Sequence, residues 1–255
     1  MHIPSCFGTN KMASSQVLLF LAAVLLSSFP GKGNGNEDIA PLSTTLRKVQ
    51  QEIVNKHNAL RRSVSPSASD MLKMEWSTES AARAQQWANR CTYGHSNREF
   101  RKINISCGEN LYMSSRPIPW SQAIQSWYDE HNNFEYAVGP KPTNAVVGHY
   151  TQIVWNTSFR VGCAIAYCPQ QFLKFFMVCH YCPAGNQLRR LYRPYTKGEP
   201  CAKCPNHCDN GLCTNSCDKE DVYSNCSDLK KSLSCDNTMV KESCKATCNC
   251  EDKIH

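Results

Sequence analysis

The stretch GHYTQIVWN, from Gly148 to Asn156, alternates polar and apolar residues and closes beside a tryptophan. Such alternation predicts a β-strand with every second side chain on the same face. The residues expected on one face are His149, Thr151, Ile153 and Trp155. Two further strands are predicted at residues 160–168 and 174–182, and the sequence PQQF between them favours a hairpin.

Three helices are predicted before these strands, at residues 49–62, 77–91 and 119–134. The first has one apolar stripe at helical spacing, and either Ser77 or Thr78 can cap the second. The stripe consists of Val49, Ile53, Val54, His57 and Leu60. Helices followed by strands indicate an α+β fold in which helices cover a sheet.

The N-terminal segment indicates the compartment. Residues 17–26, VLLFLAAVLL, are apolar but too few to span a bilayer core of ~30 Å. They are typical of the apolar region of a secretory signal, so we expect a signal peptide over residues 1–33, with Met12 as an alternative start. No later segment is long and apolar enough to cross a membrane, which predicts a secreted, soluble protein without a transmembrane segment.

The cysteines divide the chain into two regions. There are 17, and loss of Cys6 with the signal leaves an even number, which predicts eight disulfides and no free thiol. Six lie in residues 91–182, and ten lie in residues 201–250, a segment without Trp or Phe. A segment so poor in apolar surface needs crosslinks, each worth ~2–4 kcal/mol, in place of a core. We place the boundary at the Pro- and Gly-rich residues 194–200.

The charge of the chain argues against one class of partner. The formal net charge is +7, but no run of lysine and arginine is long enough to indicate a nucleic-acid site. A solvated, mildly basic surface is the simpler interpretation, and attraction to acidic cell surfaces is the alternative.

Several stretches together resemble a known family. They are GHYTQIVW at 148–155, HYCPAGN at 180–186, CGENLYMSS at 107–115 and SWYDEHNNFEYAVG at 126–139. With the tail motifs CDNGLCTNSC and CKATCNC, they resemble the cysteine-rich secretory proteins of the CAP superfamily, especially the mammalian reproductive-tract and salivary members. The resemblance implies a three-layer α-β-α sandwich over residues 40–195, a hinge over 196–217 and a small disulfide-rich helical domain over 218–255.

The resemblance also implies how the cysteines pair, which their spacing alone leaves open. The pairs expected in the larger region are Cys91–Cys168, Cys107–Cys182 and Cys163–Cys179. Those expected in the hinge are Cys201–Cys208 and Cys204–Cys213, and those in the tail are Cys217–Cys250, Cys226–Cys244 and Cys235–Cys248. A zinc site at Cys201 and Cys204 is disfavoured, because an exported chain with an even number of cysteines favours disulfides.

Members of the family carry a cleft lined by two histidines and two glutamates, and all four have counterparts here. They are His95, Glu109, Glu130 and His149, expected on a loop, at a helix end and at the start of a strand. Two neutral imidazoles suit Zn²⁺ or Cu²⁺, and two carboxylates can orient the imidazoles or bind the metal through water. A hydrogen-bonded network that fastens helices to the sheet is the alternative. Four further histidines are interpreted as structural or surface residues: His57, His131, His180 and His207.

The sequence offers no clear catalytic nucleophile. It contains neither HExxH nor GxSxG, and every cysteine of the mature chain is expected in a disulfide. We therefore predict a non-enzymatic protein that requires no cofactor and has zinc as an optional ligand. A zinc-dependent hydrolase acting through His95 and His149 is the alternative. Because an imidazole must be deprotonated to bind a metal, zinc affinity should fall below about pH 6.

The tail of the family is known as an ion-channel regulatory domain, so the resemblance implies that it modulates a membrane channel. The expected contacts are the side chains of Tyr223, Lys230, Lys231, Leu233, Met239 and Lys241, whereas Leu229 and Val240 are assigned to a small core. The resemblance further implies a role in sperm maturation or fertilisation, through a channel or a sperm or egg surface receptor. A protein of innate defence that binds sterol or another lipid is the alternative.

Three glycosylation sequons occur, at Asn104, Asn156 and Asn225. Asn104 is expected in an exposed loop and Asn156 at a strand end, so both are predicted to carry glycans. Asn225 is a weaker candidate because Cys226, the middle residue of its sequon, is expected in a disulfide.

Overall fold

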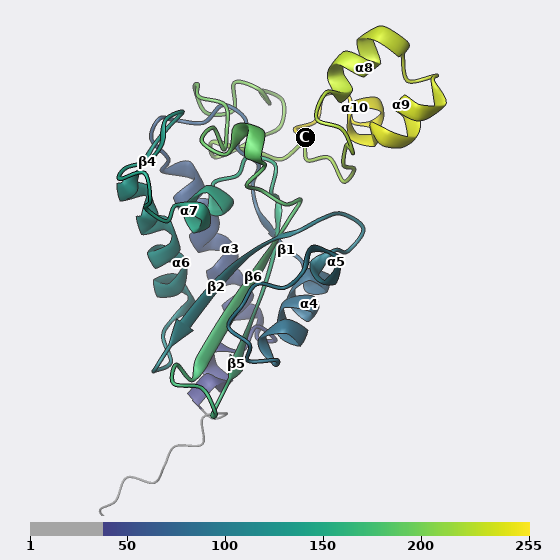
Figure 1. Cartoon of the computed structure of the whole chain (residues 1–255). Coiled ribbons are helices and arrows are strands. Elements are labelled where there is room, and N and C mark those ends of the chain that lie inside the picture. The colour runs from purple at the N-terminus through teal and green to yellow at the C-terminus, as the bar shows by residue number, and fades with distance from the viewer. Residues whose placement is uncertain (1–37) are drawn as a thin grey trace, which may run out of the picture. The chain divides into compact units, whose positions relative to one another are not determined.

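A four-stranded sheet forms the middle layer of the larger region (Figure 1). The computed structural model describes residues 38–255, so the signal peptide predicted at residues 1–33 lies outside the described residues. The strand order is β1-β5-β6-β2, with β1 parallel to β5 and the other neighbours antiparallel. The strands are β1 (Glu75–Trp76), β2 (Gly108–Ser114), β5 (Arg160–Tyr167) and β6 (Phe175–Cys182).

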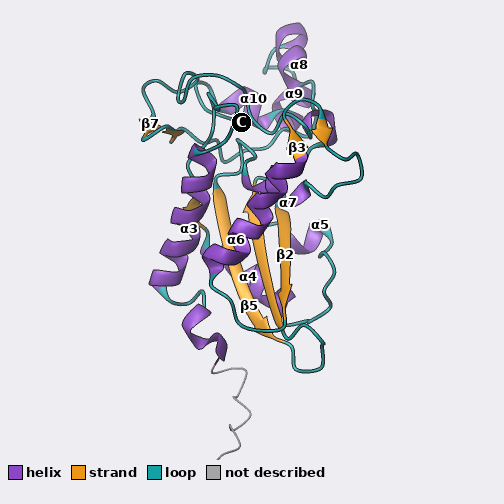
Figure 2. Ribbon diagram, turned by 90° about the vertical axis from the view of Figure 1, so that its left-hand side faces the viewer, coloured by secondary structure: helices purple, strands orange, loops and turns teal. Residues whose placement is uncertain are grey.

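Helices cover both faces of this sheet. On one face lie α3 (Arg47–Arg62) and α6 (Trp120–Tyr128), and on the other lies α4 (Thr78–Ala88) (Figures 1 and 2). The predicted α-β-α sandwich is therefore confirmed. The β5–β6 hairpin and all three predicted helices are present, although the third becomes a 3₁₀ helix, η2 (Asp129–Asn133), after Tyr128.

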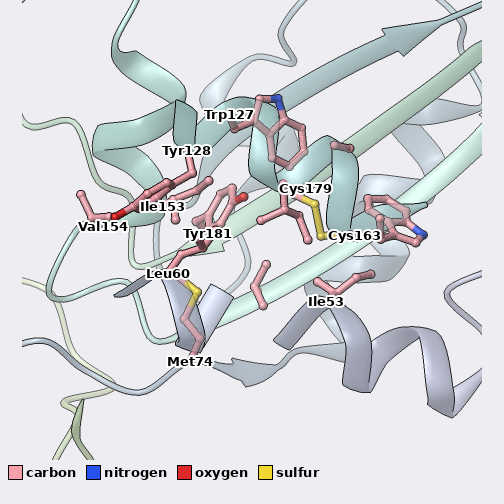
Figure 3. Close-up of a cluster of buried hydrophobic side chains, with 14 of the residues drawn as sticks. Ile53, Leu60, Met74, Trp127, Tyr128, Ile153, Val154, Cys163, Cys179 and Tyr181 are labelled. Carbon is pink, nitrogen blue, oxygen red and sulfur yellow. A yellow bond between two sulfur atoms is a disulfide. The ribbon is translucent and has the colours of Figure 1, made fainter. Parts of the chain in front are cut away.

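The face under α3 and α6 holds the main core. The predicted stripe of α3 is buried at Val49, Ile53, His57 and Leu60, while Val54 is half-buried. Figure 3 shows these helices packing through Ile53 and Trp127 around Tyr181 and the Cys163–Cys179 disulfide. Burying each large apolar side chain stabilises the fold by about 1.5–3 kcal/mol, so this cluster dominates the stability of the sandwich.

The opposite face is built for close approach of a helix. Ser77 caps α4 by accepting the N–H of Ser80, and the small residues Ala84 and Ala88 are fully buried against the sheet. Gly162 of β5 lies directly below, and a Cβ there would come within 2.2 Å of the backbone nitrogen of Ala81. Only a glycine at that position lets α4 lie so near the strand.

The stretch predicted as the first strand is a helix, α7 (Gly148–Ile153). Its last four residues, Tyr150 to Ile153, are all buried, so the alternating letters do not correspond to alternating burial. The helix packs against α6 and β2. Its two ends are held by Glu130 and Arg61, which are distant in sequence, and these tertiary contacts outweigh the local preference for a strand.

Short elements connect the layers. They are η1 (Ala40–Leu42), α5 (Arg98–Arg101), β3 (Phe134–Glu135), β4 (Gly139–Pro140) and η3 (Leu188–Arg190). Strand β2 was not predicted from the sequence, yet it carries one of the candidate site residues, Glu109. Of the helices in residues 38–255, none has the length and hydrophobicity needed to span a bilayer.

The C-terminal part begins with a small hairpin of β7 (Cys208–Asp209) and β8 (Leu212–Cys213). Asn210 and Gly211 between the strands have φ of 47° and 80°, the left-handed conformations that a two-residue turn of this kind requires. The tail then folds into three short helices, α8 (Cys226–Leu233), α9 (Thr238–Ser243) and α10 (Lys245–Asn249).

Eight disulfides join the sixteen cysteines of the described chain, in the pairs that the family resemblance implies. They are Cys91–Cys168, Cys107–Cys182, Cys163–Cys179, Cys201–Cys208, Cys204–Cys213, Cys217–Cys250, Cys226–Cys244 and Cys235–Cys248. In the tail, Val240 is fully buried among the cysteines and Leu229 packs partly against it. These two residues belong to the small core, as expected.

Candidate functional site

The four predicted site residues form two histidine–glutamate pairs. The first pair joins His95, in the loop between α4 and α5, to Glu109, the second residue of β2. The His95 Nδ1 lies 2.8 Å from Glu109 Oε1, and the histidine side chain is 59% exposed while the glutamate side chain is fully buried. Because a carboxylate only accepts hydrogen bonds, Nδ1 is the donor, and in the neutral ring Nε2 is the nitrogen left to bind a metal.

Glu109 is held by four donors in all. Its Oε1 also accepts the backbone N–H of Ser96 at 2.9 Å, and its Oε2 accepts Ser96 Oγ at 2.8 Å and His180 Nε2 at 2.9 Å. Burial alone would disfavour the charge, but the hydrogen bonds from His180, His95 and Ser96 hold the pKa of Glu109 well below its usual range. The carboxylate is therefore ionised and fully occupied as an acceptor.

An arginine pins the same loop against the edge of the sheet. Arg101 Nε donates to the Cys107 carbonyl at 2.6 Å, and its Nη1 donates to the carbonyl of Ser96. Burial lowers the pKa of Arg101 while the nearby Glu109 raises it. The loop residues around His95 are thus tied both to β2 and to the segment leading into it.

The second pair joins His149, in the first turn of α7, to Glu130 in η2. Glu130 Oε1 accepts His149 Nδ1 at 2.6 Å, and Oε2 accepts the backbone N–H groups of His149 and Tyr150 at 2.9 and 3.0 Å. The carboxylate therefore caps α7 where the helix dipole favours negative charge. The His149 ring also stacks on Trp127, with 6.2 Å between ring centroids, so its orientation is fixed on two sides.

The far end of α7 is anchored by a buried cation. Arg61, which is 1% exposed, donates from Nη1 to the carbonyls of Ile153 and Trp155 at 2.7 and 2.8 Å, and from Nε to the carbonyl of Leu72. Burial lowers the pKa of Arg61 to about 9, so the guanidinium stays charged at neutral pH and complements the negative end of the helix.

The two pairs present matching chemistry. In each, a glutamate accepts the Nδ1–H of a histidine and leaves Nε2 as a lone-pair donor, the arrangement found around metal-bound histidines. Zinc or copper would suit two such nitrogens, with His95 and His149 holding the ion and the glutamates orienting them. The carboxylates are occupied by donors, which supports the orienting role over direct ligation.

The site also contains a hydrogen-bonded network, which was the alternative interpretation: Glu109 and Glu130 each join segments that are distant in the sequence.

Other clusters of potential metal ligands lie outside this site. Within residues 38–255, three groups have potential ligand atoms within 4.8 Å of one another, and all three contain disulfide cysteines. They are Cys201, Cys204 and Cys213; Cys217, Asp218 and Cys250; and Asp221, Cys226 and Cys244. Every cysteine in these groups is already joined in a disulfide, so these groups are not metal sites. The four predicted residues form two pairs rather than one closed ligand shell.

Sequence reasoning missed two groups and misplaced one. His149 lies on a helix and not at the start of a strand, and Ser96 and His180 both bind Glu109. His180 was interpreted as structural or surface, and only the strand register, which places it opposite Glu109, brings it to the site. For Ser96, the only signal in the sequence is that a polar residue directly follows His95.

One predicted glycosylation site is buried. Asn156 is 2% exposed, and its Nδ2 donates to Asp70 Oδ2 at 2.8 Å, so this nitrogen is unavailable for a glycan in the folded chain. The prediction of a glycan at Asn156 is therefore corrected. Asn104 is exposed, as expected of the loop before β2.

Comparison with known proteins agrees with this architecture. The model of the "Cysteine-rich secretory protein family", CAP, matches residues 54–181, and the Crisp model matches residues 201–255. Cysteine-rich secretory protein 3 of Homo sapiens is 60% identical over 240 residues, which cover 94% of this chain and 98% of that protein. Cysteine-rich secretory protein 1 of Mus musculus is 57% identical over 244 residues, covering 96% and 100%.

A solved structure shows the same fold for the larger part. The crystal structure of NaASP2 with Zn²⁺ is similar with a TM-score of 0.55 and 31% identity, covering 66% of this chain and 96% of that one. An α-β-α sandwich with two histidine–glutamate pairs is thus a CAP domain. With its matching C-terminal region, the chain belongs to the cysteine-rich secretory protein family.

Proposed function

We propose that this chain is a secreted, non-enzymatic binding protein that modulates a membrane ion channel through its tail, residues 218–255. The main support is the tail itself, a unit fixed by three disulfides that leaves apolar side chains at its surface. The match of the Crisp model to residues 201–255 agrees with this assignment. The setting we propose is sperm maturation or fertilisation.

The tail surface mixes apolar and cationic groups. Tyr223, Leu233 and Met239 are 45%, 47% and 42% exposed. A frame of disulfides holds them without the entropy cost that a flexible segment would incur on binding. Rigid apolar anchors of this kind suit a groove in a channel protein.

The lysines of the tail differ in availability. Lys241 is exposed, whereas Lys230 donates to the Thr247 carbonyl at 3.2 Å and Lys231 lies 3.7 Å from Asp228. We therefore assign the larger cationic contribution to Lys241. Lys230 and Lys231 remain candidate contacts whose charge is partly engaged within the tail.

The proposal assigns zinc binding to the larger part. In both His95 and His149 a glutamate engages Nδ1, which leaves Nε2 as the nitrogen that can bind a metal, and the crystal structure of NaASP2, a structural relative, contains Zn²⁺. The engaged carboxylates of Glu109 and Glu130 support a binding role over a catalytic one, because neither is placed as a free general base. Zinc would then tune the protein rather than catalyse a reaction.

Channel modulation is tested by patch clamp with the full mature protein. The panel holds calcium, potassium, TRP-type and ryanodine-type channels, and the tail variant combines Tyr223→Ala, Leu233→Ala and Met239→Ala. A matched control combines Phe172→Ala and Leu188→Ala, which are more exposed but lie outside the tail. We expect at least a tenfold loss of potency for the tail variant and none for the control. An inert wild-type protein across the panel would refute channel modulation.

Zinc binding is tested by calorimetry. We expect a His95→Gln and His149→Gln variant to lose zinc binding and a His207→Gln control, at an exposed histidine, to retain it. Affinity should fall as pH drops from 7 to 5, because protons compete with zinc for imidazole nitrogens. Binding that is unchanged in the double variant, or constant with pH, would remove the two histidines from the site.

A further inference from the structure

Among residues 38–255, His180 is the one polar group that reaches Glu109 from within the sheet. It lies in β6, directly opposite Glu109 of β2 in the antiparallel register, and its side chain is fully buried. The other donors to Glu109 belong to His95 and Ser96, which are neighbours in the surface loop before α5. Those donors all come from one loop, so His180 is the contact that holds the carboxylate from the sheet side.

The imidazole of His180 is used for this contact alone. Its Nε2 lies 2.9 Å from Glu109 Oε2, and among the described residues its buried Nδ1 has no hydrogen-bond partner. The adjacent positions on the same face of β6 are occupied by Val178 and, beyond it, Phe176, so packing there needs only apolar side chains. A ring with one unpaired buried nitrogen is a poor filler, and its single polar contact is to the site.

The protonation pattern follows from the carboxylate. The ionised Glu109 only accepts hydrogen bonds, so Nε2 of His180, 2.9 Å from Oε2, carries a proton. Oε2 is therefore held from two sides, by His180 in the sheet and by Ser96 Oγ in the loop, while Oε1 faces His95.

We propose that His180 is a positioning residue of the zinc site, one that fixes Glu109 so that Glu109 holds His95 with its proton on Nδ1 and Nε2 open to metal. This inference rests on the proposed zinc function of the site. His95 depends on it because, within residues 38–255, its ring forms no hydrogen bond other than that to Glu109. The second pair needs no such residue, since backbone amides of α7 fix Glu130.

The test reads the tautomer of His95 in metal-free protein by long-range ¹H–¹⁵N NMR, so it does not depend on zinc binding. In the wild type we expect the proton on Nδ1. His180→Leu should shift His95 toward the tautomer protonated on Nε2, as in free imidazole side chains, whereas His180→Gln, which keeps a donor near Nε2, should restore the wild-type pattern. Phe176→Leu is the control for a general loss of packing around β6, and it should leave the tautomer of His95 unchanged.

Zinc affinity supplies the second reading. Loss of a residue that orients a metal ligand typically weakens binding 10- to 100-fold, so His180→Leu should fall in that range and His180→Gln should stay within about threefold. The tautomer of His149 should be unaffected in every variant. If His180→Leu does not fold, the wild-type spectrum still decides, because a His95 proton on Nε2 would overturn the proposal.

The two levels of the proposal fail in different ways. A wild-type protein that shows the expected tautomers but binds no zinc would refute the zinc function and leave His180 as the residue that orders the first pair. A wild-type protein that binds zinc, with His180→Leu keeping both tautomer and affinity, would show that His180 only packs.

Discussion

The larger part of the chain, residues 40–195, and the tail, residues 218–255, are stabilised in different ways. The larger part buries whole aromatic side chains such as Trp120, Trp155 and Phe176 between its layers, and its disulfides add to an existing core. In the tail, the only buried residues besides cysteines are Val240 and Ala246. In the larger part, the packed core holds buried polar networks such as that of Glu109 in place. In the tail, disulfides supply the stability, so apolar side chains need not be buried and can lie at the surface.

Two disulfides of similar span allow the sharpest test of this comparison. Cys163–Cys179 of the sandwich and Cys226–Cys244 of the tail span 16 and 18 residues. Each therefore lowers the conformational entropy of the unfolded chain to a similar extent, which stabilises the fold by about 3 kcal/mol. Replacing Cys226 and Cys244 by alanine should abolish the protection of backbone amides in residues 218–255 against hydrogen exchange. The same change in the sandwich should leave its strands protected.

If the tail depends on its disulfides and the sandwich on its core, only the tail variant should lose protection. Equal loss of protection in both variants would show that the sandwich depends on its disulfide as much as the tail does. A tail that stays protected without Cys226–Cys244 would show that Val240 and its neighbours form a sufficient core.

The anchor of α7 should give the next largest effect. Arg61→Met removes the donors to the carbonyls of Ile153, Trp155 and Leu72 and should lower the free energy of unfolding by about 2–4 kcal/mol. Urea unfolding measures this, with Arg62→Met as a matched control. Arg62 is exposed and should change the stability by less than about 0.5 kcal/mol. Similar losses in the two variants would contradict a specific anchor.

Mild acid should weaken the sandwich through a buried histidine. Burial lowers the pKa of His57 to about 4, below the ordinary value of 6.5, while the unfolded chain titrates normally. The unfolded state therefore binds more protons between pH 6.5 and 4, and stability on the order of 3 kcal/mol, complete above pH 6.5, is lost as pH falls through this window. His57→Gln should flatten the slope in urea unfolding. An unchanged slope would assign the acid sensitivity elsewhere.

The smallest effect concerns the glycans. Glycopeptide mapping of the protein secreted from mammalian cells should find modification at Asn104 and none at Asn156, because Asn104 is exposed and Asn156 is buried. Asn104→Gln should remove that mass with little change in stability. A glycan found on Asn156 would mean that its bond to Asp70 does not form in the secreted protein.

Local patterns of the sequence predicted the elements whose own residues determine them. The stripe of α3 and the aromatic and β-branched residues of the β5–β6 hairpin needed no distant partner to be recognised. Residues 148–153 were misassigned because their helix is capped by Glu130 and anchored by Arg61, contacts that no local pattern reveals. Tertiary interactions overrode a strand-like alternation.

The same limit applies to the site. The four paired residues came from family motifs, but His180 reaches Glu109 only through a strand register that joins residues 71 positions apart. A one-residue slip of that register would turn His180 to the other face of the sheet. Sequence spacing does not determine the register between β2 and β6, so this partner emerged only with the structure.

The central claim is that the tail acts on a channel and the histidine–glutamate pairs adjust that action. The direct measurement is patch clamp on one responsive channel, with and without zinc, for three full-length proteins: the wild type, the tail variant at Tyr223, Leu233 and Met239, and the variant at His95 and His149. We predict that the tail variant loses its effect while the histidine variant keeps the effect but no longer responds to zinc. Full activity of a correctly folded tail variant would contradict the account.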